Sequence, residues 1–251
     1  ARRLDGGAGG SHLVGDVVLK RADDEDEAAW VQELAAQLVP IGFRLAAPVP
    51  TVDARWVHAS WTAGAGRPGL RPAARGGAGG VPAGRGYAAG ATAVPGLSTT
   101  VLLARRHRWA RADRAAWDEE EVHLDGPPGA VLERLRSLTG EPDPSRVIVH
   151  GDLTGNVHLD RAGTPVILDI SPYLRPARWS EAIVLADALL WWDAPWSLAA
   201  SFAADAAGRD LLARALVFRL LTEPWERGDA GVDGRLDHLD QVVSRLAVGP
   251  A

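Results

Sequence analysis

The segment 150–170 concentrates polar side chains that could do chemistry beside short apolar runs. Asp152 and Asn156 are four residues apart, and Asp169 follows Asn156 by thirteen residues. Two carboxylates and an amide are hard oxygen ligands. Such ligands suit Mg²⁺, which takes one or two protein carboxylates together with waters and substrate phosphates. A loop Asp, an Asn four or five residues on and a second Asp beyond a hairpin is the pattern of phosphoryl transfer by kinases.

The N-terminal part of the chain offers the cation that phosphate groups require. Lys20 ends the apolar run 17–19 and is the only lysine in the chain. Glu27 lies on the apolar face of the helix expected next, which is a poor place for a solvated carboxylate, so we predict that it pairs with Lys20. Upstream lies a flexible glycine-rich turn whose backbone amides can approach phosphates. Its candidate binding residues are Gly7, Gly9, Gly10 and Ser11.

Two histidines in the 150–170 segment support a rival chemistry. Together with two of the acids, they offer nitrogen and oxygen ligands for a transition metal in a hydrolase. The set is His150, Asp152, His158 and Asp160. This rival leaves Asn156 and Asp169 without a role. His150 also follows a buried strand, where a histidine more often binds the backbone than a ligand.

Short apolar runs bounded by polar turns predict the strands that position these side chains. We expect strands at 147–149, 157–159 and 166–168, with a hairpin turn at 161–164. Asp152, Asn156 and Asp169 then lie at the ends of these strands, and the hairpin brings their side chains together.

The N-terminal region predicts a small α/β unit. Residues 11–20 favour a hairpin around Gly15-Asp16, and residues 51–61 favour another. Between them, residues 23–38 predict a helix. Acids crowd its first turn, where the helix dipole favours negative charge, and apolar residues recur on one face.

Changes in composition divide the chain into three segments. We predict a nucleotide-binding lobe at 1–62, an irregular segment at 63–104 and a catalytic and substrate lobe at 105–251. The middle segment is rich in Gly, Ala, Arg and Pro and has too few large apolar side chains to offset its ordering entropy. The last segment predicts helices at 128–138, 178–192, 196–206, 209–222 and 233–247. The chain is therefore expected to have strands and one helix first and several helices last. This order predicts an α+β fold of two lobes, a small sheet lobe and a larger helical lobe.

Bulk composition excludes several classes of function. A net charge of −5 argues against a nucleic-acid or anionic-membrane partner and suits a cationic small molecule. The absence of cysteine excludes disulfides, thiolate catalysis and zinc–thiolate sites. The sequence has neither an apolar run of membrane-spanning length nor the apolar core of a signal peptide at its start, so we expect a cytoplasmic protein. The acidic run 118–121 either lines a pocket for a cation or forms a solvated helix face.

Three stretches resemble one superfamily. HGDLTGN at 150–156, followed by ILDIS at 167–171, resembles the Brenner-type motif of the aminoglycoside phosphotransferase and choline kinase-like proteins. DEAAWVQEL at 26–34 resembles the first helix of that superfamily, and 167–192 is most similar to an uncharacterised actinobacterial branch. The resemblance covers about 4–62 and 105–222.

The resemblance implies a protein-kinase-like fold that binds ATP or GTP with Mg²⁺. It assigns Asp152 as catalytic base, Asn156 and Asp169 as Mg²⁺ ligands and Lys20 as the cation that positions phosphates, held by Glu27. The region after Trp61, where the family binds the nucleotide base, departs from the pattern because it runs into the glycine- and alanine-rich segment.

The length of chain after the second metal ligand favours a small-molecule acceptor. Ten residues lie between Asp169 and Ser180, where the next helix is expected, whereas protein kinases have a peptide platform of a few tens of residues there. Gly151 also stands where protein kinases carry an Arg. Aminoglycosides, sugars, choline-like alcohols and amino-acid alcohols all fit as acceptors, and the sequence specifies no oligomeric state. The alternative is a nucleotide-binding pseudokinase or regulator without transfer activity.

Overall fold

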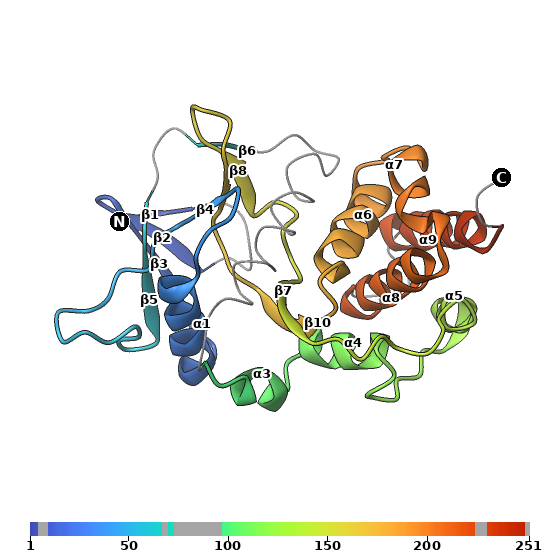
Figure 1. Ribbon diagram of the computed structural model, residues 1–251, viewed down its shortest axis with the longest axis horizontal. Coiled ribbons are helices and arrows are strands. Elements are labelled where there is room, and N and C mark those ends of the chain that lie inside the picture. The colour runs from blue at the N-terminus through green and yellow to red at the C-terminus, as the bar shows by residue number, and fades with distance from the viewer. Residues whose placement is uncertain (5–9, 67–69, 73–96, 224–229, 249–251) are drawn as a thin grey trace. The chain divides into compact units, whose positions relative to one another are not determined.

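The fold is that of a computed structural model, which describes residues 1–4, 10–66, 70–72, 97–223 and 230–248 (Figure 1). These residues form two compact units. The first holds the described residues up to 104 together with 146–177, and the second holds 105–145 and the described residues from 178 onward. The strands of the 150–170 segment therefore belong with the N-terminal sheet, whereas the sequence analysis grouped them with the C-terminal helices. The predicted α+β fold with sheet and helical parts is confirmed.

The N-terminal sheet of the first unit has the order β1-β2-β3-β5. Its antiparallel strands are β1 (Arg2–Arg3), β2 (Ser11–Val14), β3 (Val17–Arg21) and β5 (Trp61–Ala65). The predicted hairpin of β2 and β3 is present, and Gly15 adopts a φ of 57° in its turn, a left-handed conformation that glycine accepts readily. Ser11, Lys20 and Thr62 stand opposite one another in the register, so their side chains share one face of the sheet.

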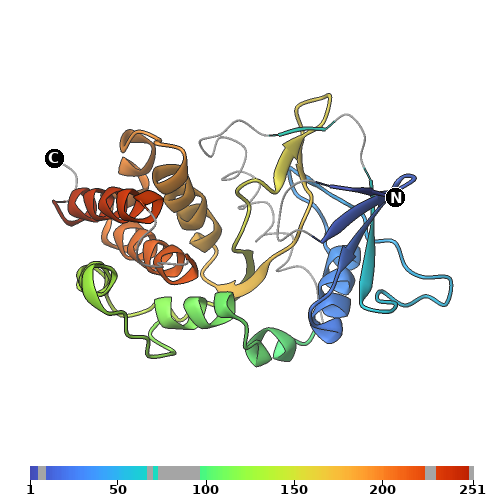
Figure 2. The ribbon, with the colours of Figure 1, turned by 180° about the vertical axis from the view of Figure 1, so that it is seen from behind.

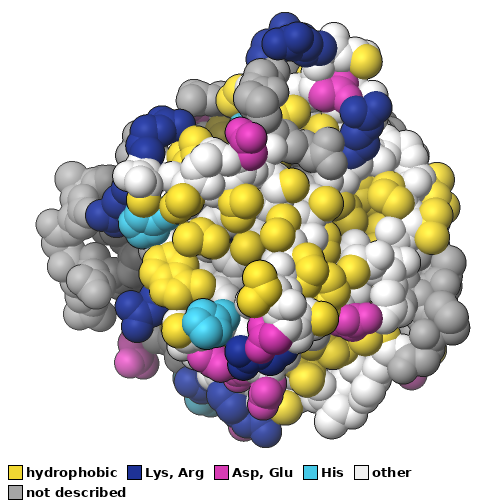
Figure 3. All heavy atoms as spheres, turned by 90° about the vertical axis from the view of Figure 1, so that its left-hand side faces the viewer, with side chains coloured by type: hydrophobic (Ala, Val, Ile, Leu, Met, Phe, Trp, Pro, Cys, Tyr) yellow, Lys and Arg dark blue, Asp and Glu magenta, His cyan; other side chains and the backbone are white. Residues whose placement is uncertain are grey.

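The predicted helix is α1 (Glu25–Gln37). Asp24 caps its N-terminus by accepting a hydrogen bond from the Glu27 N–H at 3.0 Å. The apolar face was expected at Val31, Leu34 and Leu38. Leu34 and Leu38 are buried, together with Trp30, whereas Val31 is only half-buried. Figure 3 views the end of the molecule that carries the N-terminal sheet, where hydrophobic side chains gather at the centre and charged ones toward the edge.

The hairpin predicted at 51–61 is wrong. Only Trp61 begins a strand, and residues 51–60 form a loop of turns with one isolated bridge between His58 and Trp61. The cause is local side-chain bonding: Thr51 Oγ1 accepts a hydrogen bond from the Arg55 N–H at 2.9 Å. Short polar side chains that bond the nearby backbone compete with strand pairing.

The irregular segment predicted at 63–104 contains regular structure at both ends. Its first residues belong to β5. Its strand β6 (Arg71–Pro72) pairs with β8 (Val157–Leu159), and it ends with α3 (Thr100–Ala104). Backbone pairing with β3 explains the first part, because a strand needs only backbone groups and tolerates Ala and Gly. The prediction for residues 67–69 and 73–96 lies outside the described residues.

Two further sheets hold the 150–170 segment. One has the order β4-β9-β8-β6, with β4 (Arg44–Leu45), β8 (Val157–Leu159) and β9 (Pro165–Ile167). The hairpin of β8 and β9 was predicted, and Gly163 in its turn has a φ of 82°. The other sheet pairs β7 (Val147–His150) with β10 (Pro172–Arg175), a strand that the sequence analysis missed.

The second unit is helical. Figure 2 shows its helices from behind, with α8 packed against α4, α5 and α6. The helices are α4 (Arg108–Ala116), α5 (Gly126–Arg136), α6 (Trp179–Trp191), α7 (Ser197–Ala200), the 3₁₀ helix η1 (Phe202–Ala204), α8 (Ala206–Thr222) and α9 (Ala230–Val248). The helix predicted at 196–206 is two short pieces, and α4 was not predicted.

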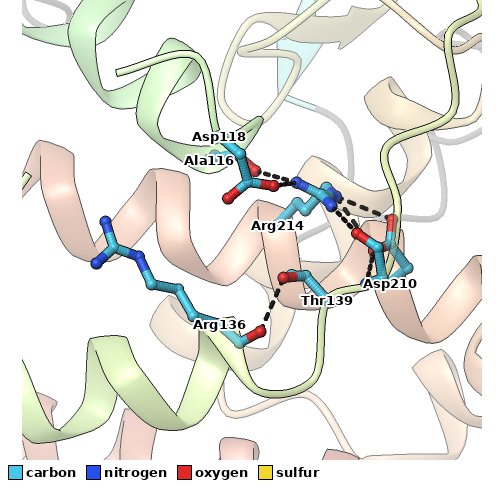
Figure 4. Close-up of polar contacts among 7 residues, drawn as sticks. Ala116, Asp118, Arg136, Thr139, Asp210 and Arg214 are labelled. Atoms are coloured by element: carbon cyan, nitrogen blue, oxygen red, sulfur yellow. Dashed lines mark hydrogen bonds and ion pairs between the residues drawn. The ribbon is translucent and has the colours of Figure 1, made fainter. Parts of the chain in front are cut away.

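A buried arginine links three parts of the helical unit (Figure 4). Arg214 of α8 donates hydrogen bonds to the Ala116 carbonyl at 2.8 Å, Asp118 Oδ2 at 2.9 Å and the Gly140 carbonyl at 2.6 Å. Asp210 accepts from its Nε at 3.0 Å. Two acids of the 118–121 run are thus paired with arginines. Asp118 binds Arg214, and Glu120 accepts hydrogen bonds from Arg111 and Arg114.

Candidate active site

The loop after β7 is held by a buried histidine. The His150 side chain is fully buried, and its Nδ1 accepts a hydrogen bond from the Asp152 N–H at 3.0 Å. Nε2 must then carry the ring proton, and it donates to the Asp169 carbonyl at 2.8 Å. Burial lowers the pKa of His150, and its hydrogen bond to the Asp169 backbone opposes that shift. His150 is therefore a neutral link between the loops that carry the two acids.

Gly151 allows this loop to pass close to β10. A Cβ at position 151 would lie 2.5 Å from Tyr173 Cδ2, so only glycine fits beside the ring. The Gly151 N–H donates to the Ser171 carbonyl at 2.9 Å and extends the pairing of β7 with β10 beyond His150. This pairing places the loop of Asp152 beside the segment that begins at Asp169.

Asn156 is tied to Asp152. Its Nδ2 donates to the Asp152 carbonyl at 2.7 Å and to Asp152 Oδ2 at 3.1 Å. Gly155, with a φ of 79°, makes the turn that precedes it. The Leu168 N–H donates to the Asn156 carbonyl at 2.9 Å, which sets Asn156 beside the residue that precedes Asp169.

Asp169 meets the lysine of the N-terminal sheet. Lys20 Nζ forms an ion pair with Asp169 Oδ2, across 149 positions of sequence. The Ile170 N–H donates to Asp169 Oδ1 at 3.0 Å and fixes the other oxygen. Both side chains keep contact with solvent, with 49% of Lys20 and 39% of Asp169 exposed, so a ligand can reach them.

Glu27 and the glycine-rich turn complete the set predicted from the sequence. The Glu27 side chain is half-buried near the start of α1, and its pairing with Lys20 stays a prediction beside the Lys20–Asp169 pair. Ser11 stands opposite Lys20. The Leu4 N–H donates to the Ser11 carbonyl at 3.0 Å, which closes the connection between β1 and β2 that contains the glycines. Gly10 precedes β2, while Gly7 and Gly9 lie outside the described residues.

The oxygen atoms of this site fit Mg²⁺. Because Asn156 uses Nδ2 to bind Asp152, its Oδ1 can serve as a ligand atom, and Asp152 and Asp169 supply carboxylate oxygens. These are hard oxygen ligands, and few in number, as Mg²⁺ prefers. The rival set does not gather: among the described residues, no group of three or more His, Cys, Asp or Glu side chains could hold a metal ion. Both ring nitrogens of His150 are also occupied by backbone groups.

Sequence reasoning missed how the acids are connected. Order and spacing led us to predict Lys20, Asp152, Asn156 and Asp169 as site residues. They did not predict that His150 links the backbone at 152 to that at 169. Nor did they identify Tyr173 as the neighbour of Gly151. The signal for the second contact was the short apolar stretch after Ser171, which forms β10.

Comparison with solved structures identifies the fold. No family model matches the sequence, and neither does any curated protein. A choline/ethanolamine kinase family protein from Mesorhizobium loti has a TM-score of 0.53 at 15% identity, covering 99% of this chain and 92% of its own. A thermostable mutant of the aminoglycoside phosphotransferase APH(4)-Ia, in a ternary complex with AMP-PNP and hygromycin B, has a TM-score of 0.55 at 13% identity, covering 98% and 91%.

This chain therefore shares the fold of the choline/ethanolamine kinase family protein and of the aminoglycoside phosphotransferase, as its motifs predicted. None of the described helices is both long enough and apolar enough to cross a membrane.

Proposed function

We propose that this chain is a Mg²⁺-dependent phosphotransferase that moves the γ-phosphoryl group of ATP or GTP to a hydroxyl group of a small molecule. The observation that carries the proposal is the contact of Lys20 with Asp169 and of Asn156 with Asp152 inside one compact unit. The kinase-like fold supports it, because the order of these residues along the chain is the kinase order.

In the proposed reaction, Asp152 orients the acceptor hydroxyl and takes its proton. The acceptor oxygen forms a bond to the γ-phosphorus while the bond from that phosphorus to the β–γ bridging oxygen breaks, and the nucleoside diphosphate leaves. Lys20, supported by Glu27, positions the α- and β-phosphates. Gly7, Gly9, Gly10 and Ser11 offer backbone amides to the phosphate oxygens. Most of the rate enhancement then comes from positioning and electrostatics.

Asn156 Oδ1 and the Asp169 carboxylate would hold Mg²⁺ in this scheme. The ion, when bound, supplies positive charge that offsets the charge on the phosphate oxygens. Asp169 is ion-paired with Lys20, so the lysine must exchange part of that contact for the phosphates when the nucleotide binds.

The proposed acceptor is a small alcohol, and cationic alcohols are among the candidates. Nine residues separate Asp169 from the start of α6 at Trp179, and four of them form β10, which leaves no room for a long peptide platform. The choline/ethanolamine kinase family protein and the phosphotransferase bound to hygromycin B support amino alcohols and aminoglycosides as first candidates. A cytoplasmic location and the absence of a nucleic-acid partner belong to the same proposal.

Thermal melting with Mg²⁺ and ATP, then with GTP, tests nucleotide binding. A nucleotide at about 100 times its dissociation constant should stabilise the wild type by about 2.7 kcal/mol. The Asp169→Ala variant should lose the Mg²⁺ dependence of this shift. Asp237→Ala, which removes an exposed acid on α9, is the matched control and should keep it. A wild type that responds to neither nucleotide contradicts the proposal.

Transfer of labelled γ-phosphate to a panel of amino alcohols and aminoglycosides tests the chemistry. Asp152→Asn should bind the nucleotide but lose about 10²–10⁴ in rate. Binding without transfer by the wild type to any acceptor would instead favour the pseudokinase alternative.

A further inference from the structure

The loop 51–60 is bonded to helix α1 at two places. Ser60 Oγ donates to Glu25 Oε1 at 2.7 Å, in the first turn of α1. Trp56 Nε1 donates to Glu33 Oε2 at 2.6 Å, about two turns further along. Both contacts reach acids of α1 from one short loop, so the loop spans the first two-thirds of the helix.

This loop is itself rigidly built. Thr51 Oγ1 donates to Asp53 Oδ1 at 2.6 Å, and Arg55 Nε donates to Asp53 Oδ2 at 2.6 Å. Ala54, Ala59 and Ser60 adopt positive φ angles of 58°, 48° and 61°. Residues with a Cβ hold such angles only where surrounding contacts fix them. The loop is therefore a strap of defined shape and not a slack connection.

The strap also holds the strand that carries the lysine. The Ala22 N–H, one residue beyond β3, donates to the Ser60 carbonyl at 2.8 Å. The strap continues directly into β5, where Thr62 stands opposite Lys20 and its Oγ1 donates to the Lys20 carbonyl at 3.3 Å. One segment is thus bonded both to the helix of Glu27 and to the strand of Lys20.

We propose that the loop 51–60 is a strap that sets α1 against β3, and that Trp56 is a positioning residue that holds Glu27 in register with Lys20. This inference rests on the proposed function, because the register matters only if Lys20 positions phosphates. The hydrogen bonds from Trp56 and Gln37 lower the pKa of Glu33, so the acceptor carboxylate stays charged and its hydrogen bond with Trp56 is charge-assisted.

Hydrogen exchange on the nucleotide-free chain tests the strap by itself. Trp56→Phe keeps the ring but removes the donor, and it should speed amide exchange over residues 33–37 of α1. Glu33→Ala should do the same, whereas Glu33→Gln keeps an acceptor oxygen and should restore slow exchange. Trp109→Phe, on α4, is the matched control and should leave α1 unchanged. Unchanged exchange in both Trp56→Phe and Glu33→Ala overturns the strap.

Titration of Mg·ATP into the same variants tests the positioning role. Trp56→Phe should weaken the nucleotide about 2- to 30-fold, the range expected for a residue that acts through others. In a Glu27→Gln background it should have no further effect, because the residue it positions is already altered. Equal weakening in both backgrounds, or an unchanged dissociation constant, overturns the positioning role. If the variants show the expected changes in hydrogen exchange but the wild type binds neither ATP nor GTP, the proposed function is overturned and the strap remains supported.

Discussion

At the scale of single residues, Gly151 is required by the tyrosine ring beside it. We predict that Gly151→Ala destabilises the protein by about 1–3 kcal/mol, because the new Cβ forces the Tyr173 ring away from the pairing of β7 with β10. Urea unfolding measures the change. Gly140→Ala is the control, because a Cβ at position 140 meets open space. The Tyr173→Leu background should reduce the effect of Gly151→Ala, and simple additivity of the two changes would argue against this contact.

His150 is a second residue whose loss has a defined consequence. We predict that His150→Leu lowers the free energy of unfolding by about 2–5 kcal/mol, because two backbone groups, the Asp152 N–H and the Asp169 carbonyl, each lose a buried partner. His123→Leu, at a side chain that is 82% exposed, should change stability by less than about 0.5 kcal/mol. Equal melting midpoints for the two variants would contradict the link.

The residues of the candidate site could be proposed from the sequence because their order and spacing are properties of the linear chain. Lys20, Asp152, Asn156 and Asp169 follow one another in the kinase order, and chemistry restricts each position to one or two residue types. Their contacts were not predictable in the same way. The pairing of Lys20 with Asp169 depends on the rotamer of a long side chain and on the packing of two sheets.

At the scale of elements, the hairpin of β8 and β9 depends on one aspartate. Asp160 Oδ1 accepts hydrogen bonds from the Ala162 and Thr164 N–H groups, both at 2.9 Å, and Arg44 pairs with its Oδ2 at 3.1 Å. The hydrogen bond from the Thr164 backbone is the main reason why the pKa of Asp160 is lowered below its usual 3.8. The ionised form of Asp160 therefore stabilises the folded state relative to the unfolded one.

We predict that Asp160→Ala reduces stability and flattens its dependence on acid pH. The sign follows from the lowered pKa: the contribution of Asp160 is present above about pH 3.8 and is lost as the pH falls through the folded value. Asp160→Asn keeps an acceptor oxygen but cannot titrate, so it should retain part of the stability and lose the same pH dependence. Melting midpoints from pH 3 to pH 7 measure both effects. A pH profile of Asp160→Ala that parallels the wild type would argue against this account.

Elements with an alternating or helical pattern of large apolar residues were predicted, and the others were not. The β2–β3 and β8–β9 hairpins carry Val, Ile and Leu beside a glycine turn. Helix α4 escaped prediction because its buried face consists mostly of alanine, which gives no strong apolar period. Strand β10 is only four residues long, begins with proline and buries Arg175, so it lacks the composition of a core strand.

At the scale of the whole molecule, the proposed site and a cluster of buried aromatic rings lie in different units. The described residues of the proposed site belong to the first unit, whereas the aromatic core of Trp117, Trp179 and Phe218 belongs to the second. The boundaries predicted from composition differ from these units, because 146–177 groups with the N-terminal sheet. That grouping arises from pairing at long sequence separation, such as β4 with β9, which no local pattern records.

The stability of the helical unit should depend strongly on Arg214. Its side chain is fully buried and joins the end of α4 and the turn after α5 to α8 (Figure 4). We predict that Arg214→Met, which keeps an apolar chain of similar shape, lowers the free energy of unfolding by about 3–5 kcal/mol. It leaves the carbonyls of Ala116 and Gly140 without this donor and Asp210 without its charge partner. Native domains are stable by only about 5–15 kcal/mol in total, so this variant should melt many degrees lower.

Arg134→Met is the matched control for this prediction. Arg134 forms an ion pair with Asp240, and 43% of each side chain is exposed. Water and salt weaken exposed pairs, so the control should lose no more than about 1 kcal/mol. Arg214→Lys should not restore the wild type, because one ammonium group cannot reproduce the planar fork that binds two carbonyls and two carboxylates. If urea unfolding gives similar losses for the variants at 214 and 134, the buried arginine does not organise the helical unit. A loss several times larger at 214 means that the folding of this unit depends on satisfying one buried charge.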